Sequence, residues 1–349
     1  EGIQMKQIPV EEAVGSILCH DITQILPGEF KGRKFKKGHI IKEEDIPVLL
    51  SLGKEHIFVW ENQPGMVHEN DAATFLKDIT MGEGLTFGEI KEGKIGFNAL
   101  YDGVLKVDAD KLLELNMLGE ISFACLMNNT PVYKGQNVAG TRVIPLVIDQ
   151  NKLDKAKEVL HGEKIISVKP MTPKRVAVVT TGSEVYYKRI EDKFGPVIIE
   201  KMKHYHCNVM GQTFVPDDKK MIKAAICEWL DKGAEMVFCT GGMSVDPDDL
   251  TPSAIKEIGG EIVTYGTPVL PGAMFLLSYY YDEAGHEIPI MGLPGCVMHA
   301  KTTVFDLILP RILAGEHMTL RDIAAFGHGG LCMQCEVCEY PKCHFGKGQ

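Results

Sequence analysis

The sequence lacks an excess of positive charge, and it lacks long apolar runs. Its 37 lysines and arginines stand against 47 aspartates and glutamates, which gives a formal net charge of −10 at pH 7. Because such a surface repels the phosphate backbone, nucleic acid is excluded as the main partner. No apolar run approaches the ~20 residues that span a bilayer, and the first residues carry no apolar core of the signal-peptide type. These absences predict a cytoplasmic protein without a membrane or nucleic-acid partner.

Two common nucleotide-binding signatures are missing as well. The strand predicted at residues 175–179 ends in Thr180-Thr-Gly-Ser-Glu184 instead of the glycine pattern G-x-G-x-x-G. The glycine-rich loop with a phosphate-binding lysine, found in P-loop enzymes, does not occur either. A Rossmann dehydrogenase is therefore disfavoured.

A chain of 349 residues is long for a single hydrophobic core, which predicts several domains. We expect a first unit at residues 1–62 and a β-rich domain with a linker at 63–170. An α/β domain is expected at 171–326 and a cysteine-rich tail at 327–349. The first unit holds the only dense basic run, Lys31-Gly-Arg33-Lys34-Phe-Lys36-Lys37. This run is either a solvated loop or a source of charge for an anionic ligand.

Short β-type runs separated by turn signals fill residues 64–150, and they predict a small β-rich domain or open barrel. These runs lie at residues 93–97, 103–107, 121–126 and 142–148. One helix is expected at residues 110–118. A second helix at 152–160, followed by a linker, leads to the next domain.

From Lys174 onward, apolar runs of strand length alternate with stretches of helical periodicity. Strands are predicted at residues 175–179, 236–239, near 262 and at 288–291, and helices at 196–206, 217–232, 252–258 and 305–313. Strands separated by helices imply a mostly parallel sheet covered on both faces. Such a sheet binds ligands at the carboxyl ends of its strands.

The stretch at residues 235–252 combines several features of a phosphate and metal site. A buried strand is followed by Gly241 and Gly242, whose backbone is free to turn its N–H groups onto an anion. Three aspartates, Asp246, Asp248 and Asp249, come next and supply oxygen ligands of the kind that Mg²⁺ binds. The alternative is a tight strand-to-helix turn whose acids are solvated.

The order and spacing of several motifs resemble the molybdopterin-binding family of molybdenum cofactor biosynthesis. These motifs are Thr181-Gly-Ser-Glu184, Val215-Pro-Asp217-Asp218, Thr240-Gly-Gly242, Asp249-Leu-Thr-Pro252, Pro271-Gly272 and Gly292-Leu-Pro-Gly295. They cover about residues 174–315, and residues 10–60 are similar to the N-terminal segment of molybdopterin molybdotransferases. The resemblance implies a three-layer α/β domain with a mostly parallel sheet, preceded by a β-rich region. It also implies binding of molybdopterin or its adenylated form with Mg²⁺, and a homo-oligomer.

The same resemblance implies which residues form the site. Contacts to the cofactor are expected from Thr181, Gly182, Ser183, Glu184, Gly241, Gly242, Ser244, Pro271, Gly272, Pro294 and Gly295. Asp217 and Asp249 are the expected catalytic residues, because their carboxylates would hold Mg²⁺ against the phosphates. Capping of the following helix is the alternative role of Asp217, and the pair Ser183 and Glu184 either contacts the ligand or caps a helix. Thr251 is expected to cap the helix that starts at Pro252.

Three functions remain open at this point. The Gly-Gly-Met-Ser-Val and Gly-Leu-Pro-Gly motifs resemble the family branch that inserts molybdate into adenylated molybdopterin and releases AMP. The Asp-Leu-Thr-Pro motif resembles the branch that adenylylates molybdopterin with ATP. The third function is a carrier or sensor that binds the pterin without turnover. The pterin and molybdate are the expected small-molecule partners.

The ten cysteines divide into six scattered ones and four in the tail, namely Cys332, Cys335, Cys338 and Cys343. Scattered single cysteines fit a reducing compartment, whereas the tail cluster is typical of metal ligation. The spacing C-x-x-C-x-x-C is similar to that of bacterial ferredoxins, and four thiolates equally suit tetrahedral zinc. An iron–sulfur cluster, a zinc ion and a redox-active tail without metal are therefore the alternatives.

Overall fold

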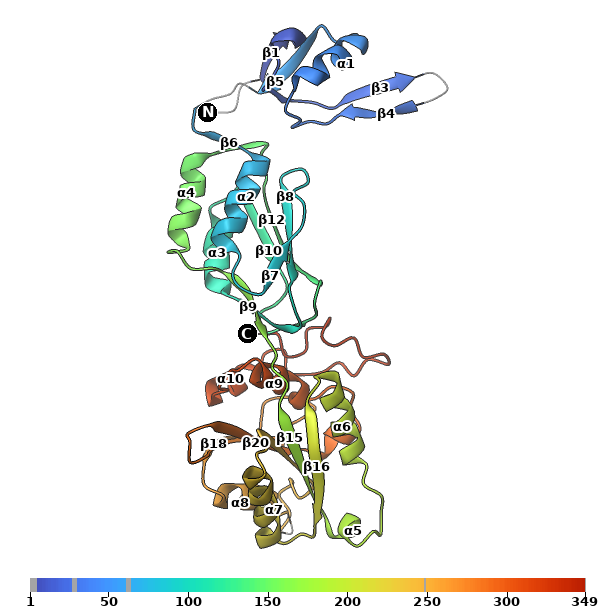
Figure 1. Ribbon diagram of the computed structural model, residues 1–349, viewed down its shortest axis with the longest axis vertical. Coiled ribbons are helices and arrows are strands. Elements are labelled where there is room, and N and C mark those ends of the chain that lie inside the picture. The colour runs from blue at the N-terminus through green and yellow to red at the C-terminus, as the bar shows by residue number, and fades with distance from the viewer. Residues whose placement is uncertain (1–4, 27–29, 61–63, 248, 349) are drawn as a thin grey trace.

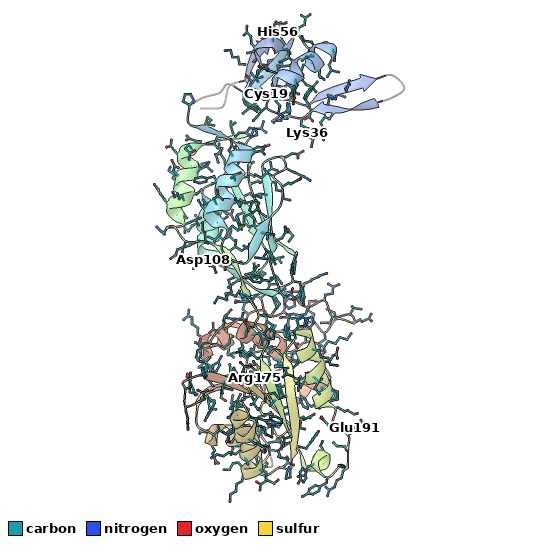
Figure 2. The ribbon with its side chains drawn as sticks, in the orientation of Figure 1. Cys19, Lys36, His56, Asp108, Arg175 and Glu191 are labelled. Carbon is teal, nitrogen blue, oxygen red and sulfur yellow. The ribbon has the colours of Figure 1, made fainter. Side chains whose placement is uncertain are left out.

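The computed structural model describes residues 5–26, 30–60, 64–247 and 249–348 of the chain. The chain forms a first unit, a middle unit and an α/β domain, which follow one another along the long axis (Figure 1). The tail runs over the end of the α/β domain that faces the middle unit. Within the described residues, every helix is too short or too polar to cross a membrane.

The first unit is a small sheet covered by one helix. Its elements are β1 (Met5–Pro9), a 3₁₀ turn (Val10–Glu12), β2 (Ile17–Leu18), β3 (Ile22–Leu26), β4 (Phe30–Phe35), a second 3₁₀ turn (Glu43–Asp45), α1 (Ile46–Ser51) and β5 (His56–Trp60). Strands β1, β5 and β2 form one sheet, while β3 and β4 pair as a separate hairpin. Leu18, Leu49 and Ile57 are buried together and tie α1 to the sheet.

The middle unit contains more helix than the glycine-rich sequence predicts. Its elements are β6 (Met66–His68), α2 (Glu69–Thr80), β7 (Leu85–Phe87), β8 (Lys94–Ala99), β9 (Gly103–Val107), α3 (Ala109–Met117), β10 (Ile121–Cys125), β11 (Pro131–Val132), β12 (Asn137–Val143), β13 (Val147–Asp149), α4 (Gln150–Val159) and β14 (Ile166–Pro170). Helix α2 was not predicted, although Ala72, Ala73 and Leu76 place a buried stripe on it.

The strands of the middle unit form separate sheets, in the orders β10-β12-β8-β7, β11-β9-β14 and β13-β6, rather than an open barrel. Two further predictions change with this arrangement. The run at residues 142–148 is split between β12 and β13, which belong to different sheets. The expected linker contains β14, which pairs with β9 from Ile166 to Pro170 and so belongs to the middle unit.

The α/β domain has the predicted alternation of strands and helices. Its elements are β15 (Arg175–Thr181), α5 (Ser183–Tyr186), α6 (Phe194–His204), β16 (Asn208–Val215), α7 (Lys219–Asp231), β17 (Met236–Thr240), α8 (Thr251–Glu257), β18 (Glu261–Tyr265), β19 (Leu276–Tyr281), β20 (Glu287–Leu293), a 3₁₀ turn (Gly295–Met298), α9 (Val304–Leu313) and α10 (Leu320–Ala325). The sheet order is β16-β15-β17-β20-β19-β18. Strands β16, β15, β17 and β20 are parallel, and β19 and β18 extend the sheet as antiparallel strands.

Both faces of this sheet are buried, as the apolar strands predict. Val176 and Val178 of β15 pack into the core on one side, where α6 and α9 lie. Ala177 and Val179 alternate with them and pack into the core on the other side, where α7 and α8 lie. The expected three-layer α/β fold is thereby confirmed.

Candidate functional site

A pocket of the α/β domain, ≈ 980 Å³ in volume, lies at the carboxyl edge of the parallel strands. Strands β15, β17 and β20 end at Thr181, Thr240 and Leu293, so the loops that follow them meet at one edge of the sheet. We call this cavity the strand-end pocket. Of the residues predicted from the sequence, it is lined by Thr181, Gly241, Gly242, Ser244, Asp249, Pro271, Gly272, Pro294 and Gly295. Gly182, Ser183, Glu184 and Asp217 are not among its lining residues.

The two glycines after β17 are required by the backbone geometry of the turn. Gly241 has a φ of +82°, and a Cβ at this position would lie 2.1 Å from the carbonyl oxygen of Thr181. Gly242 has a φ of +56°, with Thr251 Oγ1 at 2.8 Å from its would-be Cβ. The turns after β15 and β17 therefore touch, and only glycine allows this approach.

Thr251 does not cap α8, and this corrects the prediction made from the sequence. The N-cap residue is Leu250, which makes no capping hydrogen bond through its side chain. Thr251 is the first residue of the helix, and its Oγ1 donates to the carbonyl oxygen of Gly241 (2.9 Å). The hydroxyl thus fixes the glycine turn to the start of α8.

Asp217 joins the ends of β15 and β16. Its Oδ2 accepts a hydrogen bond from the backbone N–H of Ser183 (2.8 Å), and its Oδ1 accepts one from Thr181 Oγ1 (3.1 Å). Helix α7 is capped by the next residue, since Asp218 Oδ1 accepts from the N–H of Met221 (2.9 Å). The capping role considered for Asp217 on α7 therefore belongs to Asp218. Magnesium ligation by Asp217 stays a prediction.

A hydrogen-bonded chain that includes the pocket-lining residues Thr180 and Asp192 was not foreseen. Gln212 Nε2 on β16 donates to Thr180 Oγ1 (2.7 Å) and to Asp192 Oδ2 (2.8 Å). Thr240 Oγ1 donates to Thr180 Oγ1 across the sheet (3.0 Å). Asp192 Oδ1 in turn accepts from the N–H of Phe194, where α6 begins (2.9 Å). Because these partners are far apart in sequence, no local pattern reveals the chain.

Charged side chains of both signs line the strand-end pocket. Asp246 and Asp249 come from the loop after β17, and Lys193 stands before α6; Asp248 lies outside the described residues. Two carboxylates on one wall suit a hard cation such as Mg²⁺. Over the described ranges, however, no group of three or more histidine, cysteine, aspartate or glutamate side chains is arranged as a metal site.

The side chains of Cys296 and Tyr265, in and beside the strand-end pocket, have shifted pKa values. Burial raises the pKa of the Cys296 thiol, so this pocket residue is protonated at neutral pH and unsuited as a nucleophile. Burial and the nearby Asp249 carboxylate raise the pKa of Tyr265. The protonated Tyr265 hydroxyl donates to the carbonyl oxygen of Met243 (2.9 Å) and holds the loop after β17 in place.

Comparison with known proteins shows which family contains similar sequences. The model of a probable molybdopterin binding domain matches residues 177–314. The molybdopterin adenylyltransferase of Pyrococcus furiosus is 32% identical over 145 residues, a match that covers 37% of this chain and 81% of that protein. The chain belongs to the molybdopterin-binding family. Residues 7–61 match the model of a domain of unknown function.

Two further similar proteins share a lower sequence identity with the chain. The molybdopterin molybdenumtransferase of Synechococcus elongatus is 22% identical over 147 residues, which cover 40% of this chain and 36% of that protein. The chain matches 26% to 36% of the length of the first four curated relatives. A solved structure, the molybdopterin biosynthesis enzyme MoaB of Thermus thermophilus, has a TM-score of 0.35 and 21% identity, covering 41% of this chain and 98% of that chain.

The region matched to the molybdopterin-binding family ends before the tail. All four tail cysteines line a second cavity of ≈ 400 Å³, which we call the tail pocket. It thus assembles the four residues that the sequence singled out, although they do not form a ready site for one metal ion.

Proposed function

We propose that the strand-end pocket binds molybdopterin in its adenylated form and that the protein inserts molybdate with release of AMP. The observation that carries this proposal is the joint lining of one pocket by Gly241, Gly242, Asp246 and Asp249 at the carboxyl edge of the sheet. Its volume of ≈ 980 Å³ is in the range of pockets that enclose a small molecule. The glycine turn can bind the phosphates in this pocket, and the two aspartates can bind the cation that neutralises their charge.

Each group has a defined part in this proposal. The N–H groups of the glycine turn and the ammonium of Lys193 bind the phosphate oxygens. Asp246 and Asp249 would hold Mg²⁺, which supplies charge neutralisation at the phosphates when bound. Asp217 positions the turn through its bonds to Thr181 and Ser183. An oxygen of molybdate or water would then form a bond to the phosphorus on the pterin side, the bond from that phosphorus to the bridging oxygen would break, and AMP would leave with the bridging oxygen.

Adenylylation of molybdopterin is the second candidate. It is favoured by the Asp249-Leu-Thr-Pro252 motif and by the 32% identity to the adenylyltransferase of Pyrococcus furiosus. Both reactions make or break the same phosphoanhydride, so the same glycine turn and acids serve either of them. A carrier that binds the pterin without turnover is the third candidate. Unlike the two enzymes, a carrier would form neither AMP nor pyrophosphate.

The decisive experiment follows two products with one purified protein. Adenylated molybdopterin, Mg²⁺ and molybdate are incubated and AMP is measured; in parallel, molybdopterin and ATP are incubated and pyrophosphate is measured. AMP release that requires molybdate supports insertion, whereas pyrophosphate supports adenylylation. Pterin binding with neither product supports the carrier. No pterin binding at all would contradict the proposal.

Asp249 gives the sharpest variant. We expect Asp249→Asn to reduce turnover by at least about 100-fold, because a metal ligand at the phosphates is lost. The melting temperature should hardly change, since substitutions at loop positions outside the core usually shift stability by less than about 0.5 kcal/mol. Asp231→Asn is the matched control, because Asp231 is exposed at the far end of α7 and does not line the strand-end pocket. Full activity of Asp249→Asn would remove this residue from the mechanism.

Two further parts belong to the same proposal. We expect a homo-oligomer, as the family resemblance implies, and sedimentation of the purified chain tests this. We also expect the four thiolates of the tail to hold a metal centre, either an iron–sulfur cluster or zinc.

A further inference from the structure

The cysteine segment of the tail is a loop closed at its base. The N–H of Gly346 donates to the carbonyl oxygen of Gly329 (2.9 Å), which joins the two ends of the segment. The first end of the segment is also hydrogen-bonded to the α/β domain. The N–H of Leu270 donates to the carbonyl oxygen of Gly330 (2.8 Å), and the N–H of Cys332 donates to the carbonyl oxygen of Leu270 (2.9 Å). The loop is therefore held in place although it contains no helix or strand of its own.

Side chains at the other end of the loop anchor it to the hydrophobic core. Phe345 is only 1% exposed and packs in the same core as α9. The hydroxyl of Tyr340 donates to the backbone carbonyl of Asp306 on α9 (3.1 Å). Between these anchors, Met333 and Val337 are largely exposed, 74% and 73%. The fold thus fixes both ends of the segment and leaves its middle open to a ligand.

Two of the four tail sulfur atoms already take part in hydrogen bonds. The N–H of Gln334 donates to Cys332 Sγ (3.4 Å), and Thr302 Oγ1 is hydrogen-bonded to Cys338 Sγ (3.1 Å). N–H and O–H groups directed at sulfur stabilise thiolates and tune the centres that they bind.

The tail pocket has the ligands and the room for a cluster of several iron atoms. All four cysteines line this one cavity of ≈ 400 Å³. Three of them follow the C-x-x-C-x-x-C spacing that is similar to the bacterial ferredoxin run. As the side chains of the described residues stand, no three of them form a site for a metal ion, so assembly of the cluster would draw the four sulfurs together.

We propose that Cys332, Cys335, Cys338 and Cys343 bind an iron–sulfur cluster in the tail pocket. Each cysteine loses its thiol proton and forms one sulfur–iron bond, and ferric and ferrous ions supplied together with sulfide give the oxidation level of the cluster, so no residue of the polypeptide is oxidised or reduced. The tail pocket and the strand-end pocket share Pro271 in their walls. The cluster would therefore lie beside the proposed pterin site. The cluster itself is proposed independently of the pterin chemistry.

The test measures metal and sulfide in the chain, purified without oxygen and reconstituted with ferric and ferrous iron and sulfide. We expect at least about two iron atoms per chain with an equal amount of sulfide, and visible absorbance that dithionite bleaches. Cys335→Ser and Cys338→Ser should each lose most of the iron and sulfide. Cys227→Ser on α7 is the matched control and should retain both.

The other outcomes overturn the proposal. One zinc per chain without sulfide would replace the cluster by a tetrahedral zinc site, and no bound metal after reconstitution would leave the tail without a metal centre. Full iron in both tail variants would place the cluster elsewhere. Thermal unfolding of each variant is recorded as well, and a folded variant that has lost its iron supports ligation rather than general collapse. Because no readout involves the pterin, failure of the proposed pterin chemistry leaves this test unaffected.

Discussion

Replacement of Gly241 by alanine tests whether the contact between the two turns holds the site together. Gly241 has a φ of +82°, and the added methyl would lie 2.1 Å from the carbonyl oxygen of Thr181. Thr181 cannot easily move away, because its hydroxyl is bonded to Asp217. In addition, the N–H of Gly182 is bonded to the carbonyl oxygen of Val215 (3.2 Å). The strain therefore falls on the turn that lines the strand-end pocket.

Two costs add up in this variant. The left-handed backbone conformation costs an alanine about 1–2 kcal/mol. Displacing a packed backbone oxygen costs about 1–3 kcal/mol more, as in other overpacked cores. We therefore expect the free energy of unfolding of the α/β domain to fall by about 2–5 kcal/mol. For a domain of this size, that corresponds to a loss of roughly 4–20 °C in melting temperature.

Urea unfolding can report the α/β domain alone. The chain has two tryptophans, Trp60 in the first unit and Trp229 on α7. In a Trp60→Phe background, fluorescence follows Trp229, whose indole N–H donates to Thr213 Oγ1 on β16 (2.9 Å). The midpoint of the Trp229 transition should shift in Gly241→Ala, while its slope stays the same.

Gly295→Ala provides the contrast that isolates binding from stability. No atom lies within 4 Å of a Cβ built on Gly295, and its φ is outside the left-handed region. Because Gly295 lines the strand-end pocket, the methyl should weaken pterin binding about 10-fold. Stability should stay within about 0.5 kcal/mol, as in the control Gly88→Ala, which is equally unhindered but outside the pocket. Wild-type stability of Gly241→Ala would refute the reasoning about the turn.

Further predictions concern charge. Lys193→Ala should raise the KM for a phosphate-bearing pterin about 10-fold by removing a charge-assisted bond; Lys203→Ala, outside the pocket, is the control, and an unchanged KM would exclude Lys193 from binding. Burial alone would raise the pKa of Glu316. The positive charges and hydrogen bonds of Arg311 and Lys106 lower this pKa by more than burial raises it, so the pKa lies below its ordinary value of 4.5. The stability from Glu316 is therefore present above pH 4.5 and lost as the pH falls further. The difference in unfolding free energy between wild type and Glu316→Gln should shrink in that range, and a constant difference would contradict the assignment.

The sequence was sufficient for elements whose signal is local. Helix α7 was expected because apolar residues such as Ile222, Ala225 and Ile226 recur at helical spacing, and these residues are buried. Strand β17 was expected because all five of its residues are apolar or small, and all are buried. In both elements, the pattern of apolar residues within the element is sufficient to predict that it is buried.

Elements that depend on their neighbours were missed. Strand β16 is an edge strand that pairs only with β15, and most of its side chains are half-exposed, so it lacks an apolar run. Strand β19 was not recognised, although Leu276 and Leu277 are buried, because it pairs antiparallel between β20 and β18. Pairing partners of this kind are set by the tertiary fold.

The candidate site shows the same limit at the level of single side chains. Asp217 and Asp249 follow strand ends and are indistinguishable as acids in the sequence. In the structure, both oxygens of Asp217 accept hydrogen bonds from the turn after β15, whereas Asp249 lines the strand-end pocket. The two hydrogen bonds occupy one lone-pair site on each oxygen of Asp217 and hold its carboxylate in a fixed orientation.

We therefore expect different roles for Asp217 and Asp249. The shape of the strand-end pocket depends on Asp217, which fixes the turn of Thr181 against the end of β16. In the proposed function, the chemistry at the phosphates would depend on Asp249 and Asp246, which come from the loop that Tyr265 holds in place. Loss of Asp217 would therefore disturb stability and ligand affinity together. We expect instead that removal of either acid on the loop after β17 lowers turnover and leaves the fold intact.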